Sequence, residues 1–166
     1  MLAQLADTVV AGATVALLLL VLRTPLTPAL LWVPVLGLLL IIVTAAAALL
    51  LSCANLFFRD VKYIVQVVLT FGIFFTPVFF EPAMLGPRWA PLMMLNPLSP
   101  PLEGLRLAVV EGHSLLTPLI VTTRAGVDIL AWTPWYLGYT AAVGALALFA
   151  SALLFHRLEY LFAEYV

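Results

Sequence analysis

The chain has 166 residues, of which 65% are hydrophobic and 9% are charged, and its formal net charge at pH 7 is −1. With a mean hydropathy of +1.20 it is more apolar than a soluble core requires, which indicates an integral membrane protein. The net charge argues against nucleic acid as a partner. Because the apolar runs lack the strict alternation of barrel strands, the sequence predicts an all-α membrane fold.

The predicted elements begin with two membrane spans. A helix crosses a bilayer core about 30 Å thick with about 20 residues, so the chain has room for four spans and one large extramembrane segment. The first span is expected at about residues 5–22, where Arg23 and Pro25 stop it, and the second at about residues 32–54. A signal peptide is disfavoured, since no positive charge precedes the first apolar run.

A compact group of charges follows the second span, at Arg59, Asp60 and Lys62. A charged side chain at the centre of a bilayer costs about 3 kcal/mol on insertion scales, so these residues mark a tight turn at one water interface. They are referred to below as the charged turn. A third span is then expected at about residues 61–80, with a kink at Pro77.

Polar and aromatic side chains recur at helical spacing along this third span. They fit a lined pathway, because polar residues within a span are often functional. They fit equally well the packing of one helix on another, with Gln66 and Thr70 bonded to neighbouring helices. The candidate pathway residues are Tyr63, Gln66, Thr70, Phe71, Phe74, Phe75 and Phe79.

The segment at residues 81–134 is too long for a turn and too rich in proline for another span. Short interfacial helices are expected in it, most clearly after Ser99, a candidate N-cap, and before Gly112, a candidate terminator. Glu103 and Arg106 are spaced to pair on one face of that helix.

A fourth span is expected at about residues 135–155. Lysine and arginine are nearly balanced between the two sides of the membrane, so charge alone does not orient the chain. The sequence contains no G-x-x-x-x-G-K-[ST] motif, and nucleotide hydrolysis by this chain is not expected. An enzyme acting on a lipid-linked substrate remains an alternative, with its acids drawn from Glu81, Glu103, Glu111 and Asp128.

Three stretches in order resemble the membrane subunit of ABC-2-type exporters: NLFFRDVKYIVQVVLTFGIFFTPVFF from Asn55, MLNPLSPPLEGLR from Met94 and FHRLEYLFAEYV from Phe155. The resemblance is strongest to the permeases that export polysaccharides, namely O-antigen, capsule and teichoic acid. Members of that family usually carry six spans. The resemblance therefore implies that this chain corresponds to the last four, with the N-terminal part of the family domain absent.

The resemblance also implies a function. The chain would be a multi-pass permease of the bacterial cytoplasmic (inner) membrane, in contact with membrane lipid, that moves a glycan or lipid-linked glycan without changing it covalently. It would pair with a second copy of itself and with an ATPase subunit that binds the ATP and Mg, so no cofactor is expected in this chain. A permease for drugs or other lipids is the alternative within the same fold.

Positions for two functional regions follow from the same resemblance. The charged turn would face the cytoplasm and contact the ATPase subunit, although an ordinary interface turn that binds lipid head groups has the same charges. Residues 81–134 would form an outer gate. Its candidate residues are Asn96, Pro97, Glu103, Gly104 and Arg106.

Overall fold

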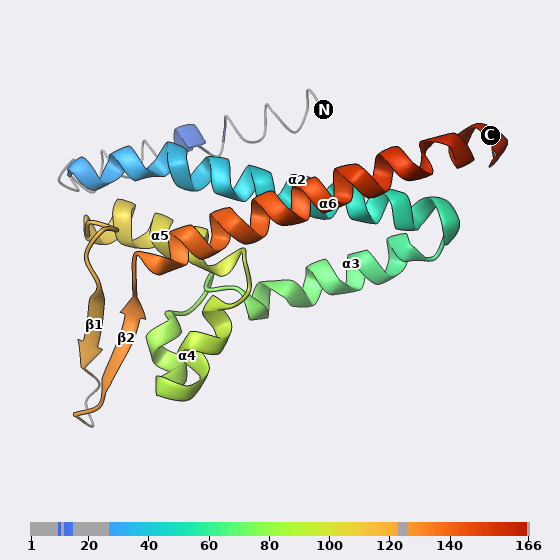
Figure 1. The fold of residues 1–166 in the computed structure, drawn as a ribbon. Coiled ribbons are helices and arrows are strands. Elements are labelled where there is room, and N and C mark those ends of the chain that lie inside the picture. Colours follow the sequence, from blue (N-terminus) through green and yellow to red (C-terminus); the bar gives the residue numbers. More distant parts are fainter. Residues whose placement is uncertain (1–9, 11, 15–26, 123–125, 166) are drawn as a thin grey trace.

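A computed structural model describes residues 10, 12–14, 27–122 and 126–165 (Figure 1). Within these residues the fold is mostly helical and includes one antiparallel strand pair. The predicted first span, at about residues 5–22, lies almost entirely outside the described residues.

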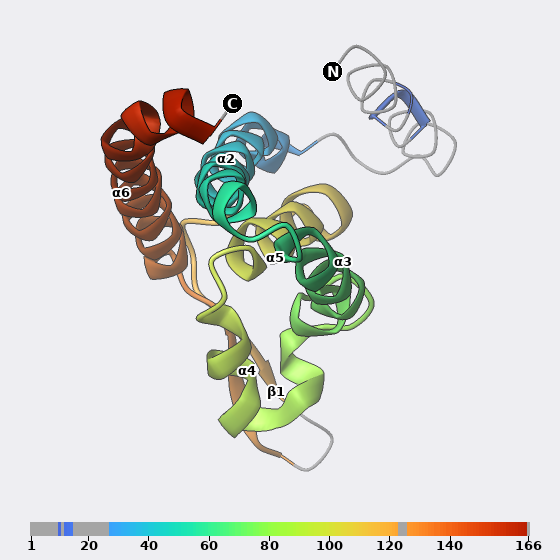
Figure 2. The ribbon, with the colours of Figure 1, turned by 90° about the vertical axis from the view of Figure 1, so that its right-hand side faces the viewer.

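Two long helices form the axis of the molecule. Helix α2 (Trp32–Phe57), which continues the short helix η1 (Pro28–Leu31), and helix α6 (Trp135–Tyr165) run side by side in the same direction (Figures 1 and 2). Within the described residues, Pro28–Asn55 and Trp135–Leu158 are long and apolar enough to cross a membrane, with mean hydropathies of 2.7 and 1.8. They coincide with the predicted second and fourth spans.

Helix α3 corrects the predicted third span. It covers Val61–Gly72, and η2 (Ile73–Phe75) extends it by one turn. The helix therefore ends before Phe80, because the ring of Pro77 disfavours a helical conformation at the residue before it, and Thr76 is extended with φ −127° and ψ 146°. Pro77 thus follows the end of the helix and does not kink it. At 1.5 Å per residue the helix is about 22 Å long, shorter than the roughly 30 Å of a bilayer core.

Short elements fill the segment between α3 and α6. The helical ones are η3 (Pro82–Leu85), α4 (Gly86–Met94), α5 (Ser99–Arg106) and the single π turn η4 (Leu107–Glu111). Strands β1 (Leu119–Thr122) and β2 (Asp128–Trp132) follow. In both views α4 and the strands project to one side of the α2 and α6 pair (Figures 1 and 2).

The strand pair departs from the all-α expectation. Leu119–Thr122 and Asp128–Trp132 alternate between more and less exposed side chains, as strands covered on one face do. Ile120 pairs with Leu130 across the ladder, and the Thr122 hydroxyl donates to Oδ1 of Asp128 over 2.7 Å. Each strand is only four or five residues long, which is too short for the alternation to stand out in so apolar a sequence.

The buried core sits at one end of the long helices. Trp132 is fully buried, and its indole N–H donates to the backbone oxygen of Leu115 over 2.9 Å. Leu36 of α2, Met94 of α4 and Leu107 of η4 complete the same cluster. Residues from four elements therefore meet around this tryptophan, which fixes the short helices to the end of α2.

Candidate functional site

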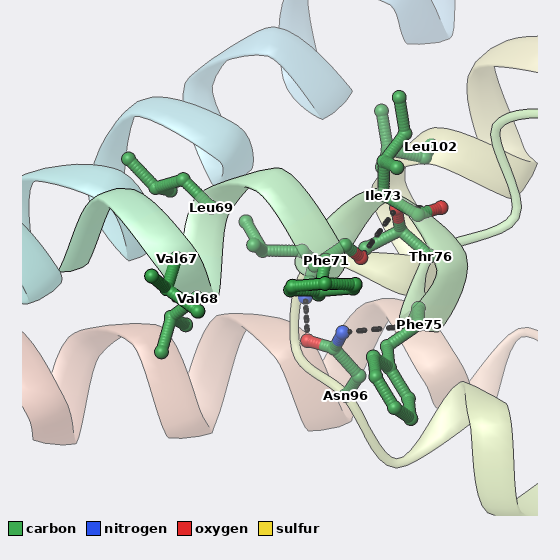
Figure 3. A pocket seen from close by; sticks show the side chains of 11 residues that line it. Val67, Val68, Leu69, Phe71, Ile73, Phe75, Thr76, Asn96 and Leu102 are labelled. Atoms are coloured by element: carbon green, nitrogen blue, oxygen red, sulfur yellow. Dashed lines mark hydrogen bonds between the residues drawn. The ribbon is translucent and has the colours of Figure 1, made fainter. Parts of the chain in front are cut away.

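A cavity of about 750 Å³ lies between the end of α3 and the start of α5 (Figure 3). Its volume is in the range of cavities that hold small molecules. Most of the side chains around it are apolar. They are Val67, Val68, Leu69, Phe71, Ile73, Phe75, Leu98 and Leu102, together with Gly72, Thr76 and Asn96.

The polar side chains of this cavity are already bonded within the protein. The Thr76 hydroxyl lies 3.3 Å from the backbone oxygens of Gly72 and Ile73. The Asn96 amide donates to the backbone oxygen of Phe75 over 3.0 Å and accepts from the backbone N–H of Leu98 over 3.1 Å (Figure 3). A ligand would therefore meet mainly hydrocarbon and aromatic surface.

A second cavity of about 310 Å³ adjoins the first, since Phe75 and Asn96 line both. Its wall is more aromatic, with Phe74, Phe80 and Trp89 added to Phe75. The first cavity is thus lined mainly by aliphatic side chains and two phenylalanines, and the second mainly by aromatic rings.

An ion cluster is centred on Arg106, the last residue of α5. The guanidinium of Arg106 holds Glu103 with two nitrogens: Nε donates to Oε2 over 3.1 Å, and Nη2 makes a short contact with Oε1. Its third nitrogen, Nη1, lies 2.6 Å from Glu81 and 3.5 Å from Glu111. These four residues are referred to below as the Arg106 cluster.

Burial sets the electrostatics of this cluster. The Glu103 side chain is fully buried, and the loss of water raises the pKa of its carboxyl above the ordinary value of 4.5, although Arg106 partly opposes the effect. Burial alone would lower the pKa of Arg106, but the hydrogen bonds and charges of Glu103 and Glu81 outweigh it and raise that pKa. The arginine therefore stays charged, and the buried Glu103 carboxyl takes a proton more readily than it would in water.

The charged turn lies at the opposite end of α2 from the Arg106 cluster (Figure 1). Arg59 and Asp60 form the turn between α2 and α3, and both are exposed. Lys62 is the second residue of α3, and its ammonium lies 4.8 Å from the ring centroid of Tyr63, a cation–π contact. These charges are open to a partner or to lipid head groups.

The predicted pathway residues separate into two groups. Phe71, Phe74 and Phe75 line the two cavities, and Phe79 lines a smaller one of about 220 Å³ next to Glu81 and Arg106. Tyr63, Gln66 and Thr70 are exposed nearer the charged turn and line none of these cavities. The Thr70 hydroxyl donates to the backbone oxygen of Gln66 over 2.8 Å, within its own helix.

The predicted gate residues all lie in the packed end of the molecule. Asn96 links the loop before α5 to the end of α3, and Pro97 follows it in that loop. Glu103 and Arg106 pair as their spacing predicts. Gly104 lies so close to α2 and β2 that an added Cβ would stand 3.0 Å from Leu36 and 3.2 Å from Trp132.

The prediction that Ser99 caps the N-terminus of helix α5 is wrong. Helix α5 does begin there, but its N-cap residue is Leu98, and no side chain caps the helix. A serine cap would accept from the backbone N–H of Pro101 or Leu102, but Pro101 has none and that of Leu102 donates to the backbone oxygen of Leu98 over 3.4 Å. The buried Ser99 hydroxyl has no hydrogen-bond partner among the residues that the structure describes.

Sequence inspection missed two members of the Arg106 cluster as partners. Glu81 and Glu111 were visible only as acids in a long segment, and nothing in the spacing of Glu81 from Arg106 indicates contact. For Leu98, Leu102 and Trp89 the sequence offers no signal either, because their positions around the cavities depend on how α4 and α5 fold back onto α3.

Residues 1–110 match the family model described as ABC-2 type transporter. The chain belongs to this family. Neither the curated proteins nor the solved structures contain a match to it. The family provides the membrane component of ABC transporters, so this chain is a transport permease component in a membrane, and its family implies an ATPase partner.

Proposed function

We propose that this permease moves a polysaccharide or lipid-linked glycan across the bacterial cytoplasmic membrane. Two copies of the chain would form the path, and a separate ATPase subunit would bind ATP and Mg and drive export. Family membership supports the permease role. The choice of cargo rests on the two cavities beside α3.

The chemistry of the larger cavity is the observation that carries this proposal. Sugar hydroxyls need hydrogen-bond partners, and the polar side chains of this cavity are engaged within the protein. Hydrocarbon needs only apolar contact, which the valine, leucine and phenylalanine walls supply. The cavity therefore fits the lipid carrier of a lipid-linked cargo better than it fits a bare sugar chain.

The aromatic second cavity favours a glycan at the other end of the same cargo. The C–H faces of sugar rings stack on aromatic side chains, and Phe74, Phe80 and Trp89 present such rings next to the apolar cavity. An exporter of lipids or drugs would use the apolar cavity in the same way. Export of lipids with and without an attached glycan distinguishes these two candidates. A glycan exporter requires the attached glycan, whereas an exporter of lipids or drugs does not.

The test compares Phe71, Phe75 and Phe79, all replaced by alanine, with Phe149→Ala as the matched control. Phe149 lies on α6 and is 65% exposed, close to the exposure of the three phenylalanines that are replaced. In vesicles that contain the permease and its ATPase subunit, export of a lipid-linked oligosaccharide should fall at least about tenfold in the triple variant and little in the control. Such a loss corresponds to about 1.4 kcal/mol, within what one buried aromatic contact contributes.

Thermal stability in detergent is measured on the same variants. If folding and export are lost in equal measure, these phenylalanines serve helix packing and the pathway role is excluded. If the triple variant exports at the normal rate, the cargo does not use this cavity.

A further inference from the structure

One nitrogen of Arg106 forms ion pairs with two acids from different parts of the chain. Glu103 occupies Nε and Nη2 and is fully buried, so that side of the guanidinium is fixed. Nη1 lies 2.6 Å from Glu81 but 3.5 Å from Glu111, and both of these carboxylates are partly exposed. A terminal guanidinium nitrogen carries two N–H groups, and Nη1 pairs with both acids, closely with Glu81 and more loosely with Glu111.

The π turn explains why Glu111 reaches Arg106 at all. Five residues separate the two, and in a regular α-helix that spacing turns the second side chain about 140° away from the first. A π turn closes its hydrogen bonds between residues five apart, which brings such a pair onto one face. Helix η4 (Leu107–Glu111) is a single turn of this kind, placed directly after Arg106.

The end of this turn is fixed in place. Gly112 has φ +63°, in the left-handed region that glycine adopts without strain. An added Cβ there would stand 2.8 Å from Thr27, so the backbone at Gly112 packs directly against the start of η1. The π turn therefore adjoins Arg106 at one end and is packed against the residue before η1 at the other.

We infer that Glu81 and Glu111 exchange for Nη1 of Arg106, and that this exchange releases the segment after α3 from α5. Glu81 lies between α3 and η3, so its ion pair ties that segment to α5. Glu111 belongs to the same continuous helix as Arg106, so its ion pair does not tie that segment to α5. The exchange gives two arrangements of the cluster, and a gate requires an element with two states. Its role in gating rests on the proposed function.

The test measures a distance in the reconstituted permease with its ATPase subunit, without cargo. Cys53 is replaced by alanine, since it is the only cysteine, and spin labels are attached at Leu31 on η1 and Met84 on η3. Both positions are more than two thirds exposed, at 77% and 71%. Glu81→Gln should shift the distribution of distances between the two labels to longer values. Glu111→Gln should make this distribution narrower and shift it to shorter values.

Amide hydrogen exchange at residues 107–113 gives a second measurement with the same logic. Glu81→Gln leaves Arg106 to Glu111 and should slow exchange in the π turn, whereas Glu111→Gln should speed it. Asp128→Asn is the matched control, because Asp128 is an acid of the same segment whose carboxylate accepts from Thr122 and lies outside the cluster.

Opposite shifts in the two variants support the exchange. Unchanged distances, or shifts in the same direction, overturn it, and so does unfolding of either variant while Asp128→Asn stays folded, since the cluster would then be a static support. Because no cargo is present, these outcomes leave the proposed cargo site untouched, and failure of that site leaves the distances as they are.

Discussion

Glu103 is the residue at which burial and charge conflict most directly. Its side chain is fully buried, yet its carboxylate carries a bidentate pair with Arg106. A buried carboxylate costs several kcal/mol unless it is paired, and Arg106 offsets only part of that cost because the guanidinium is shared with Glu81. The folded protein therefore favours the protonated form of Glu103 more than the unfolded chain does.

This conflict predicts a dependence of stability on pH. Well below pH 4.5 the Glu103 carboxyl is neutral in both the folded and the unfolded state, so its contribution to stability is complete. As the pH rises through the higher folded-state pKa, the folded protein must hold a buried charge and this contribution is lost. Each unit of pKa difference corresponds to about 1.4 kcal/mol. Glu103→Gln should therefore remove part of the fall in melting temperature between pH 4.5 and neutral pH.

The measurement is thermal unfolding of the purified protein in detergent across that range, with Asp128→Asn as the control. The Asp128 carboxylate accepts from Thr122 and lies outside the Arg106 cluster, so its removal should leave the Glu103 slope in place. A slope that is the same in Glu103→Gln and in the native chain would show that Arg106 compensates fully for the burial.

At the scale of single residues, the sequence predicted the ion pair of Glu103 with Arg106 but not the contacts of Arg106 with the other two acids. The i, i+3 spacing of Glu103 and Arg106 is a local rule of helix geometry, so their contact needed no further knowledge. Glu111 has the wrong spacing for an α-helix, and only the π turn brings it to Arg106. Glu81 reaches the cluster through the fold of the whole segment, which no local rule describes.

Among the helices and strands, the sequence predicts what local chemistry decides and fails where neighbouring elements decide. The long apolar runs of α2 and α6 and the left-handed Gly112 at the end of η4 follow from such local patterns. Pro77 was a visible signal whose effect was misjudged, because a proline ends a helix when no neighbouring helix supports a kink, and no residue of α3 is buried. The strands depend on α4 and η3 for cover, through Ala83 and Ala90.

The contact between α2 and α6 predicts which glycine of α6 is essential. A Cβ added at Gly144 would stand 3.1 Å from Val43 and 3.2 Å from Ile42, whereas a Cβ at Gly138 would meet nothing within 4 Å. Overpacking of a close contact costs about 1–3 kcal/mol. Gly144→Val should therefore destabilise the helix pair by roughly that amount relative to Gly138→Val.

Both substitutions place the same valine in the same helix, so the difference between them excludes the effect of helix propensity. Chemical or thermal unfolding in detergent measures it. Equal stability of the two variants would mean that α6 shifts along α2 to make room, and that the close approach at Gly144 is not required.

At the scale of the whole molecule, the packed end and the charged turn lie at opposite ends of α2. The Arg106 cluster, the cavities and the buried tryptophan lie toward one end, and the charged turn lies at the other (Figure 1). Composition and hydropathy predict the exposed position of the charged turn, since charges leave the bilayer at its surfaces. The cavities and the Arg106 cluster depend on how the short helices fold, which composition does not determine. Which surface faces the cytoplasm comes from the resemblance to ABC-2 exporters and stays a prediction.

The charged turn is predicted to be the place where the ATPase subunit binds. Arg59→Glu combined with Lys62→Glu reverses two exposed charges without touching the packed end, so membrane insertion should persist while co-purification of the ATPase subunit falls several-fold. Charges at the rim of an interface act mainly on association and its salt dependence, so the native complex should also weaken as salt is raised. Arg88→Glu is the matched control, an exposed arginine on α4 at the other end of the molecule. If the double variant retains the ATPase subunit as well as this control does, the turn contacts lipid head groups and the docking surface lies elsewhere.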